Sequence, residues 1–144
     1  SGSCGRRGCC EAYSSATALI ERTIWAMEED AGSAMWQTFT SDTATGKTAF
    51  DYMDTDISAH EVVEWYVKYL ACGLINLANI FRPQAIILGG GVCGQGDYLI
   101  DKLKDYCVKR EYGFAGMPRF DILIAQLGND AGVVGAAGLI YELI

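Results

Sequence analysis

The sequence is poor in basic residues and in histidine, and it has no long apolar run. Eleven lysines and arginines face 18 aspartates and glutamates, which gives a formal net charge of -7. That balance argues against nucleic acid or an anionic membrane as a direct partner. No apolar stretch approaches the roughly 20 residues that span a bilayer. With 144 residues, 51% of them hydrophobic, the chain is long enough for one core.

Cysteine is well represented, with six residues in the chain. No secretory signal segment accompanies them, and several lie in otherwise apolar stretches. This usage favours reduced thiols over a disulfide framework, and it predicts a cytoplasmic protein. The six positions are Cys4, Cys9, Cys10, Cys72, Cys93 and Cys107.

Residues 4–11 read Cys-Gly-Arg-Arg-Gly-Cys-Cys-Glu and carry the most specific chemistry. Closely spaced cysteines with glycine turns suit a structural Zn²⁺ site, which takes four thiolate or imidazole ligands. Cys4 and Cys9 supply two ligands at most. The single histidine, His60, lies far along the chain and is expected to be solvated. We therefore expect the chain by itself to hold Zn²⁺ weakly or not at all; a reduced cysteine pair with no metal is the alternative.

Apolar periodicity predicts most of the helices. Ser58 and Glu61 have the spacing of a capping box, which predicts the start of a long helix, buried on most sides, that Pro83 ends. Asn129 or Asp130 is the predicted cap of the last helix. The predicted helices cover residues 11–29, 48–52, 59–81, 97–110 and 131–143.

Two short apolar runs predict strands, over residues 85–88 and 120–126. With the helix between them they predict a parallel strand, helix, strand unit with a right-handed crossover. A pair of parallel strands leaves both edges open and is marginal alone. The chain therefore resembles part of a larger sheet in a helix-rich α/β fold.

The first strand runs into a glycine-rich turn, residues 89–94, which matches G-x-G-x-x-G. The match to the dinucleotide fingerprint is weak, since no ribose-binding acid ends the next strand at the required distance. Residues 46–48 imitate a P-loop, but Ser41 stands where its first glycine belongs. The better interpretation is that a nucleotide base or ribose lies directly on the glycine backbone. The candidate contacts are Gly89, Gly90, Gly91 and Val92.

These motifs together resemble the ROK family of repressors, unassigned reading frames and sugar kinases. Its cysteine pattern is Cys-x-Cys-Gly-x-x-Gly-Cys-x-Glu; Cys10 falls on a variable position, and Gly2 replaces the first cysteine. Residues 86–92 resemble the family's adenosine motif, and residues 127–132 its segment before the closing helix. The resemblance covers nearly the whole chain in the right order. The matching positions of the cysteine pattern are Gly5, Gly8, Cys9 and Glu11.

The resemblance implies an actin-like, ribonuclease H-like fold whose two lobes close on ATP and a hexose. Residues 1–3 read like a cloning remnant, and residues 4–144 would be the C-terminal part of the kinase domain without its N-terminal lobe. In the intact protein Glu11 would bind sugar hydroxyls, and Asn129 would join the glycine turn in binding the cofactor ATP. Mg²⁺ would accompany ATP, and Cys4 and Cys9 would hold a structural Zn²⁺ with ligands from an upstream segment.

Within the family the chain is most similar to bacterial glucokinases, which implies phosphorylation of D-glucose by ATP to glucose 6-phosphate, a step of glycolysis. Family members commonly form homodimers. The phosphate loops and the catalytic aspartate precede the cysteine motif, so we expect this chain alone to be inactive. Two alternatives remain: the effector-binding half of a ROK transcriptional repressor, and an unrelated nucleotide-binding or structural module. Upstream sequence would separate the kinase from the repressor.

Overall fold

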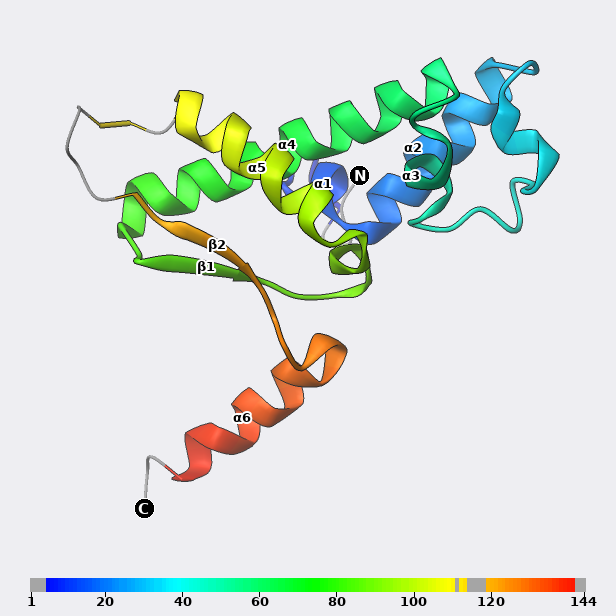
Figure 1. Cartoon of the computed structure of the whole chain (residues 1–144). Coiled ribbons are helices and arrows are strands. Elements are labelled where there is room, and N and C mark those ends of the chain that lie inside the picture. Colours follow the sequence, from blue (N-terminus) through cyan, green and yellow to red (C-terminus); the bar gives the residue numbers. More distant parts are fainter. Residues whose placement is uncertain (1–4, 111, 114–118, 142–144) are drawn as a thin grey trace.

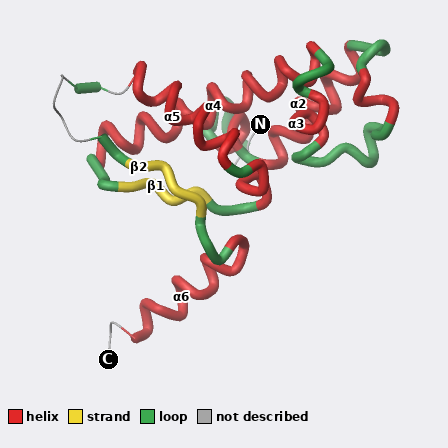
Figure 2. Tube along the Cα trace, viewed as in Figure 1, coloured by secondary structure: helices red, strands yellow, loops and turns green. Residues whose placement is uncertain are grey.

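The computed structural model describes residues 5–110, 112–113 and 119–141. A helical body lies above a small sheet, and a last helix projects from it (Figures 1 and 2). None of the helices in these ranges is long and apolar enough to cross a bilayer. The elements are α1 (Glu11–Ser14), α2 (Ala16–Glu29), the 3-10 helix η1 (Ala34–Gln37), α3 (Thr48–Tyr52), α4 (Ile57–Phe81), β1 (Ala85–Leu88), the 3-10 helix η2 (Gly91–Gln95), α5 (Asp97–Arg110), β2 (Asp121–Ile124), the 3-10 helix η3 (Gly128–Asp130) and α6 (Ala131–Tyr141).

The first predicted helix, residues 11–29, is two helices in the structure. Ser15 separates them with an extended backbone, φ -83° and ψ 164°. Its hydroxyl oxygen accepts a hydrogen bond from the Ala18 amide at 3.1 Å, which caps α2. The prediction of one continuous helix was wrong because a good capping residue interrupts an apolar spacing that continues through it.

The long helix α4 begins earlier than the capping box predicted. Asp56 is the N-cap, and its carboxylate accepts hydrogen bonds from the Ala59 amide at 3.0 Å and from the Ser33 hydroxyl at 2.7 Å. Ser58 therefore lies inside the first turn, where its hydroxyl donates to Asp30 Oδ2 at 2.6 Å. The Ser58 cap was wrong because Asp56 also binds the segment around η1, a tertiary contact that local spacing does not contain.

The end of α4 agrees with the prediction, since the helix stops at Phe81, before Pro83. Arg82 closes it in the left-handed conformation, with φ 47° and ψ 50°. Its Nη2 donates to the Tyr112 carbonyl at 2.7 Å. The prediction that α4 is buried on most sides was wrong for its last turns, where apolar side chains face outward. These are Leu77, Ile80 and Phe81.

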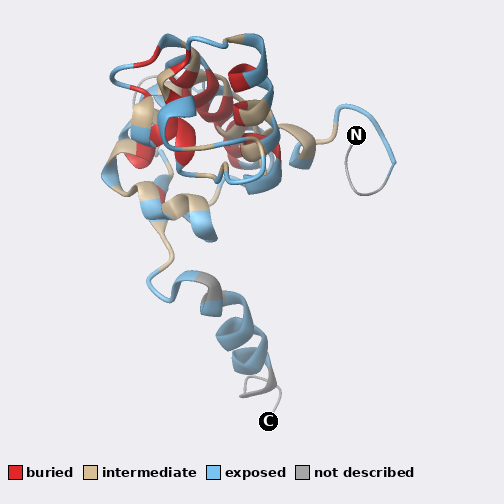
Figure 3. Cartoon of the chain, turned by 90° about the vertical axis from the view of Figure 1, so that its right-hand side faces the viewer, coloured by how far each residue is buried: buried red, intermediate tan, exposed pale blue. Residues whose placement is uncertain are grey.

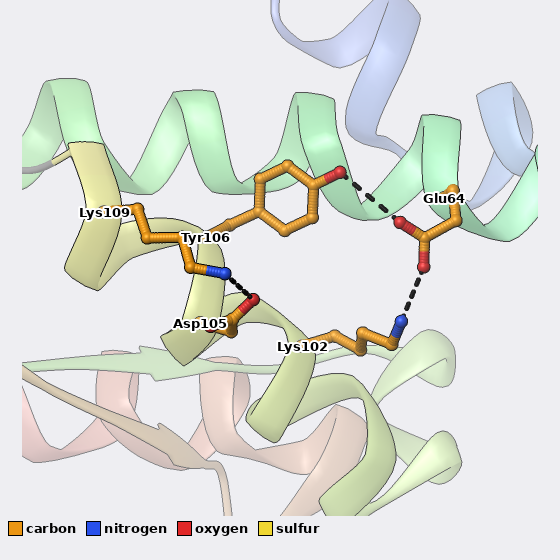
Figure 4. Close-up of polar contacts among 5 residues, drawn as sticks. All are labelled: Glu64, Lys102, Asp105, Tyr106 and Lys109. Atoms are coloured by element: carbon orange, nitrogen blue, oxygen red, sulfur yellow. Dashed lines mark hydrogen bonds and ion pairs between the residues drawn. The ribbon is translucent and has the colours of Figure 1, made fainter.

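The hydrophobic core lies among α2, η1, α3, α4 and α5 (Figure 3). Helix α5 is fixed to α4 at its surface by Lys102, which pairs with Glu64 at 2.7 Å, and by Tyr106, which reaches the same carboxylate at 3.4 Å (Figure 4). The largest fully buried side chains include Leu19, Met27, Met35, Leu99 and Leu103.

The sheet consists, within the described residues, of β1 and β2 in parallel register, and it confirms the predicted strand, helix, strand unit. The second strand is shorter than predicted, Asp121–Ile124 instead of residues 120–126. Ile122 is buried beneath the helices, whereas the paired Ile87 and Leu123 are exposed on the opposite face. One face of the sheet is thus covered and the other is apolar and open.

The last helix, α6, leaves the body and extends away from it (Figures 1 and 3). Its small residues permit close packing against a neighbour, but residues 132–139 are exposed. The prediction extended the helix to residue 143; residues 142–144 lie outside the described part of the chain. An apolar helix without cover is the most unusual feature of this fold.

Candidate functional site

A cavity of about 240 Å³ lies where the turn after β1 meets the junction of α1 and α2. One wall is the glycine turn, and the other carries the end of α1, the start of α2 and part of α4. The lining residues are Ser14, Ser15, Ala16, Tyr66, Leu70, Leu88, Gly89, Gly90, Gly91, Val92, Cys93 and Leu99.

The glycine turn shapes this cavity through its backbone. Gly90 has φ 95° and ψ 173°, a conformation that residues with a side chain rarely adopt. A Cβ at Gly90 or at Gly91 would meet no atom within 4 Å, so both glycines border open space. The four residues predicted to contact a nucleotide, Gly89 to Val92, are brought together here.

Two titratable groups, Tyr66 and Cys93, line the cavity. The Tyr66 hydroxyl donates to the Ser14 carbonyl at 3.1 Å. Burial, assisted by the nearby Cys93 thiol, raises the pKa of Tyr66 to about 12. Burial also raises the pKa of the Cys93 thiol. Both groups are therefore neutral at pH 7, and the cavity offers hydrogen-bonding groups without fixed charge on its lining side chains.

Glu11 stands on α1, three residues before the Ser14 wall of the cavity, and it is exposed. As the first residue of the helix it complements the helix dipole. It does not line the cavity itself. The structure thus brings α1 to the glycine turn, but it places the predicted sugar ligand and the predicted nucleotide residues in adjoining regions.

The predicted cofactor residue Asn129 belongs to η3, which packs beside η2. Its side chain lies outside the part of the chain that the structure describes. The backbone of η3 nevertheless borders the same turn that carries Gly91 and Val92, so its position agrees with the predicted grouping.

The predicted metal ligands are described only in part. Cys4 lies outside the described residues, and Cys9 precedes α1. In the described ranges no three His, Cys, Asp or Glu residues gather closely enough to hold a metal ion. Cys10, which the prediction left out of the ligand set, points its sulfur at the Ser14 hydroxyl at 3.1 Å. The described residues thus supply no complete Zn²⁺ site, and the role of Cys4 and Cys9 stays a prediction. His60 is exposed, as predicted.

Comparison with known proteins settles the family. The ROK family profile matches residues 1–142. The chain belongs to the ROK family. It is 33% identical to the glucokinase of Halalkalibacterium halodurans over 145 residues, 96% of this chain and 42% of that protein. It is 27% identical to the xylose repressor of Bacillus spizizenii, over 97% of this chain and 33% of the repressor.

Solved structures agree. A ROK glucokinase from Streptomyces griseus, determined in complex with glucose and AMPPNP, matches with a TM-score of 0.81 and 30% identity, over 94% of this chain and 45% of that one. The chain therefore spans less than half the length of these ROK relatives.

The sequence did not predict several cavity residues of this ROK chain. Ser14 and Ser15 lie three and four residues after Glu11, the end of the cysteine motif, so their place in the chain was an available signal. Tyr66 had no such signal, because it lies 52 residues from the carbonyl that it binds. Only the packing of α1 on α4 makes it part of the site.

Proposed function

We propose that this chain is the sugar- and adenosine-binding part of an ATP-dependent hexose kinase of the glucokinase type. The observation that carries the proposal is the cavity between the glycine turn and the α1–α2 junction, in a chain one-third identical to a glucokinase. The reaction is transfer of the terminal phosphoryl group of ATP to a hexose hydroxyl, with glucose as the first candidate.

Glu11 is the proposed sugar ligand. An ionised carboxylate accepts hydrogen bonds from two adjacent hydroxyls, and each such charge-assisted bond contributes roughly 1.5 to 3 kcal/mol. Its exposed position at the start of α1 supports this role, because a sugar can reach it from the surface.

The glycine turn is the proposed adenosine contact, through Gly89, Gly90, Gly91 and Val92, with Asn129 alongside. The absence of side chains at the three glycines lets a flat base or ribose approach the backbone. Mg²⁺, bound with the nucleotide, would neutralise phosphate charge. Among the residues that the structure describes, no three His, Cys, Asp or Glu residues gather closely enough to hold a metal ion without the phosphates.

We further propose that residues 4–144 form the C-terminal portion of a two-lobed, actin-like domain, with residues 1–3 a cloning remnant. The short length relative to the relatives supports this. So do the apolar face of the sheet, at Ile87 and Leu123, and the exposed helix α6. On this proposal the catalytic aspartate and the phosphate loops lie outside the chain, which alone is inactive.

The remaining parts of the proposal follow from the family. Cys4 and Cys9 would contribute to a structural Zn²⁺ site completed by upstream residues, the protein would be cytoplasmic, and it would act as a homodimer. Each is separately testable, by metal analysis, fractionation and sedimentation of the whole gene product.

The deciding experiment measures ADP release by the whole gene product with Mg-ATP and a panel of glucose, mannose, fructose and N-acetylated hexosamines. Turnover with one sugar is expected and would name the substrate. Absence of turnover with every sugar, in a folded and zinc-loaded protein, would refute the kinase.

The identity to a xylose repressor favours a second candidate, the effector-binding half of a ROK transcriptional regulator. That protein would bind a sugar at Glu11 but would transfer no phosphoryl group. A basic helix-turn-helix domain upstream, together with sugar-sensitive binding to operator DNA, would establish it.

A further inference from the structure

Helix α1 is short and is held against one face of α4. Cys10, at the N-cap of α1, packs closely on Gly73 of α4. A Cβ at position 73 would lie only 3.0 Å from the Cys10 sulfur. The Tyr13 ring stacks on the Tyr69 ring, with centroids 4.7 Å apart and planes inclined by 28°. A four-residue helix has no stability of its own, so these contacts fix its position.

The C-terminal end of α1 needs a third contact. In a continuous helix the Ala18 amide would donate to the Ser14 carbonyl, but here it donates to the Ser15 hydroxyl oxygen instead. The Ser14 carbonyl accepts from the Tyr66 hydroxyl at 3.1 Å. Tyr66 is 2% exposed. Without its hydroxyl the carbonyl would lose its donor at the point where the helix breaks.

The same tyrosine also forms part of the cavity. Tyr66 and Ser14 line one wall, and the glycine turn from Leu88 to Cys93 lines the other. Tyr66 and Cys93 thus border the same cavity from opposite walls. Tyr66 therefore binds the end of helix α1, which carries Glu11, and also borders the cavity that the glycine turn lines.

We propose that Tyr66 is a positioning residue that holds the Glu11 helix in register with the glycine cavity. This inference rests on the proposed function, in which Glu11 binds the hexose and the glycine turn binds the nucleotide. Removal of the hydroxyl releases the end of α1, so Glu11 is presented to the sugar less accurately while the tyrosine ring still fills the core.

The test compares Tyr66→Phe with Tyr52→Phe in the whole gene product. Tyr52 is the matched control, because its hydroxyl also makes a hydrogen bond, to Thr38 Oγ1 at 2.5 Å, but lies away from the cavity. The readouts are kcat, the KM for hexose and for ATP, hexose affinity by calorimetry, and hydrogen exchange of the amides of residues 11–18.

For Tyr66→Phe we expect the KM for hexose to rise roughly fivefold, the effect of one ordinary hydrogen bond. The kcat should change by less than about twofold, since no reacting group is removed. Exchange of residues 11–18 should accelerate, and Tyr52→Phe should alter none of these. An unchanged KM with unchanged exchange, or equal changes in both variants, would overturn the inference.

The two proposals can fail separately. If the protein transfers no phosphoryl group but Tyr66→Phe still weakens hexose binding fivefold, the kinase is refuted and the positioning role stands. If turnover is normal and neither KM nor exchange responds, the kinase stands and the positioning role is refuted. A protein that binds no hexose refutes both.

Discussion

The helical body and the C-terminal part of the chain, from β2 onward, differ in how far their apolar residues are buried. In the body, α2 and α5 bury Leu19, Met27 and Leu103 completely, and α4 likewise buries Val63 and Val67. From β2 onward the buried core gains only Ile122 among the described residues, while Val133 and Leu139 lie on an exposed helix (Figure 3). Hydrophobic content alone therefore does not make a core; an apolar helix also needs a surface to pack against.

The largest difference in stability is expected when the same change, leucine to alanine, is made once in the body and once in α6. Leu103→Ala should lower the free energy of unfolding of this chain by about 2 to 5 kcal/mol, because it opens a cavity in a closed core. Leu139→Ala should change it by less than about 0.5 kcal/mol, because the side chain is 63% exposed. Urea denaturation followed by circular dichroism measures both. Equal losses would show that α6 packs on the body in solution.

The next largest loss of stability is expected for a substitution in the glycine turn. Gly90→Ala should cost about 1 to 3 kcal/mol, because φ 95° with ψ 173° strains any residue that has a Cβ. Gly91→Ala is the control, since it has no positive φ and its Cβ would meet no atom within 4 Å. The melting temperatures of the two variants are compared by thermal unfolding. Similar melting temperatures would contradict the positive φ at Gly90.

The cap of α4 should make the body sensitive to acid. Burial by itself would raise the pKa of Asp56, but hydrogen bonds from the Ser33 hydroxyl and from backbone amides outweigh it and hold the pKa below its ordinary value. The ionised carboxylate therefore stabilises the fold above pH about 4, and that contribution is lost as the pH falls through the lowered pKa.

Asp56→Asn should cost about 1 to 2 kcal/mol at pH 7, because an amide NH₂ replaces one of the two oxygens that accept from Ser33 and Ala59. It should also flatten the loss of stability in acid. The control is Asp54→Asn, two residues earlier and exposed. Unfolding free energies measured at pH 7, 5 and 3 supply the comparison. If the unfolding free energy falls as steeply between pH 5 and pH 3 in Asp56→Asn as in the unsubstituted chain, Asp56 is not the cause of the acid sensitivity.

The smallest effect belongs to the ion pair between α4 and α5. The hydrogen bond that Lys102 donates to the Glu64 carboxylate is the main cause that raises the pKa of Lys102, but both side chains remain about one-third exposed. Glu64→Gln should therefore cost less than about 1 kcal/mol, and less still in high salt. Asp105→Asn, which breaks the exposed pair with Lys109, should cost about 0.3 to 0.5 kcal/mol. Denaturation at two salt concentrations checks the order.

Sequence patterns predicted the helical body well where neighbouring residues alone determine the secondary structure. The strand at residues 85–88 and the helix at residues 97–110 lie where apolar spacing placed them. The patterns failed where a distant contact decides between local options. Asp56 and Ser58 are both good caps, and Asp56 prevails because it also binds Ser33.

The candidate site divides in the same way. The glycine run identified the residues from Gly89 to Val92 that border the cavity, because a turn after a buried strand is a local signal. Tyr66 could not be found from sequence, since its role exists only when α1 packs on α4. The ligand roles of Glu11 and of the glycine turn stay predictions until a sugar and a nucleotide are tested.

The left-handed Arg82 limits how far this protein can be stabilised by design. Glycine is the usual choice at the end of a helix, and at φ 47° it would remove about 1 kcal/mol of backbone strain. The same change would delete the guanidinium that holds the Tyr112 carbonyl at 2.7 Å. A consensus approach that scores each position by its own backbone would choose glycine here. It would thereby leave Tyr112 joined to α4 through the hydrogen bond from its amide to Asn79 Oδ1 at 3.2 Å.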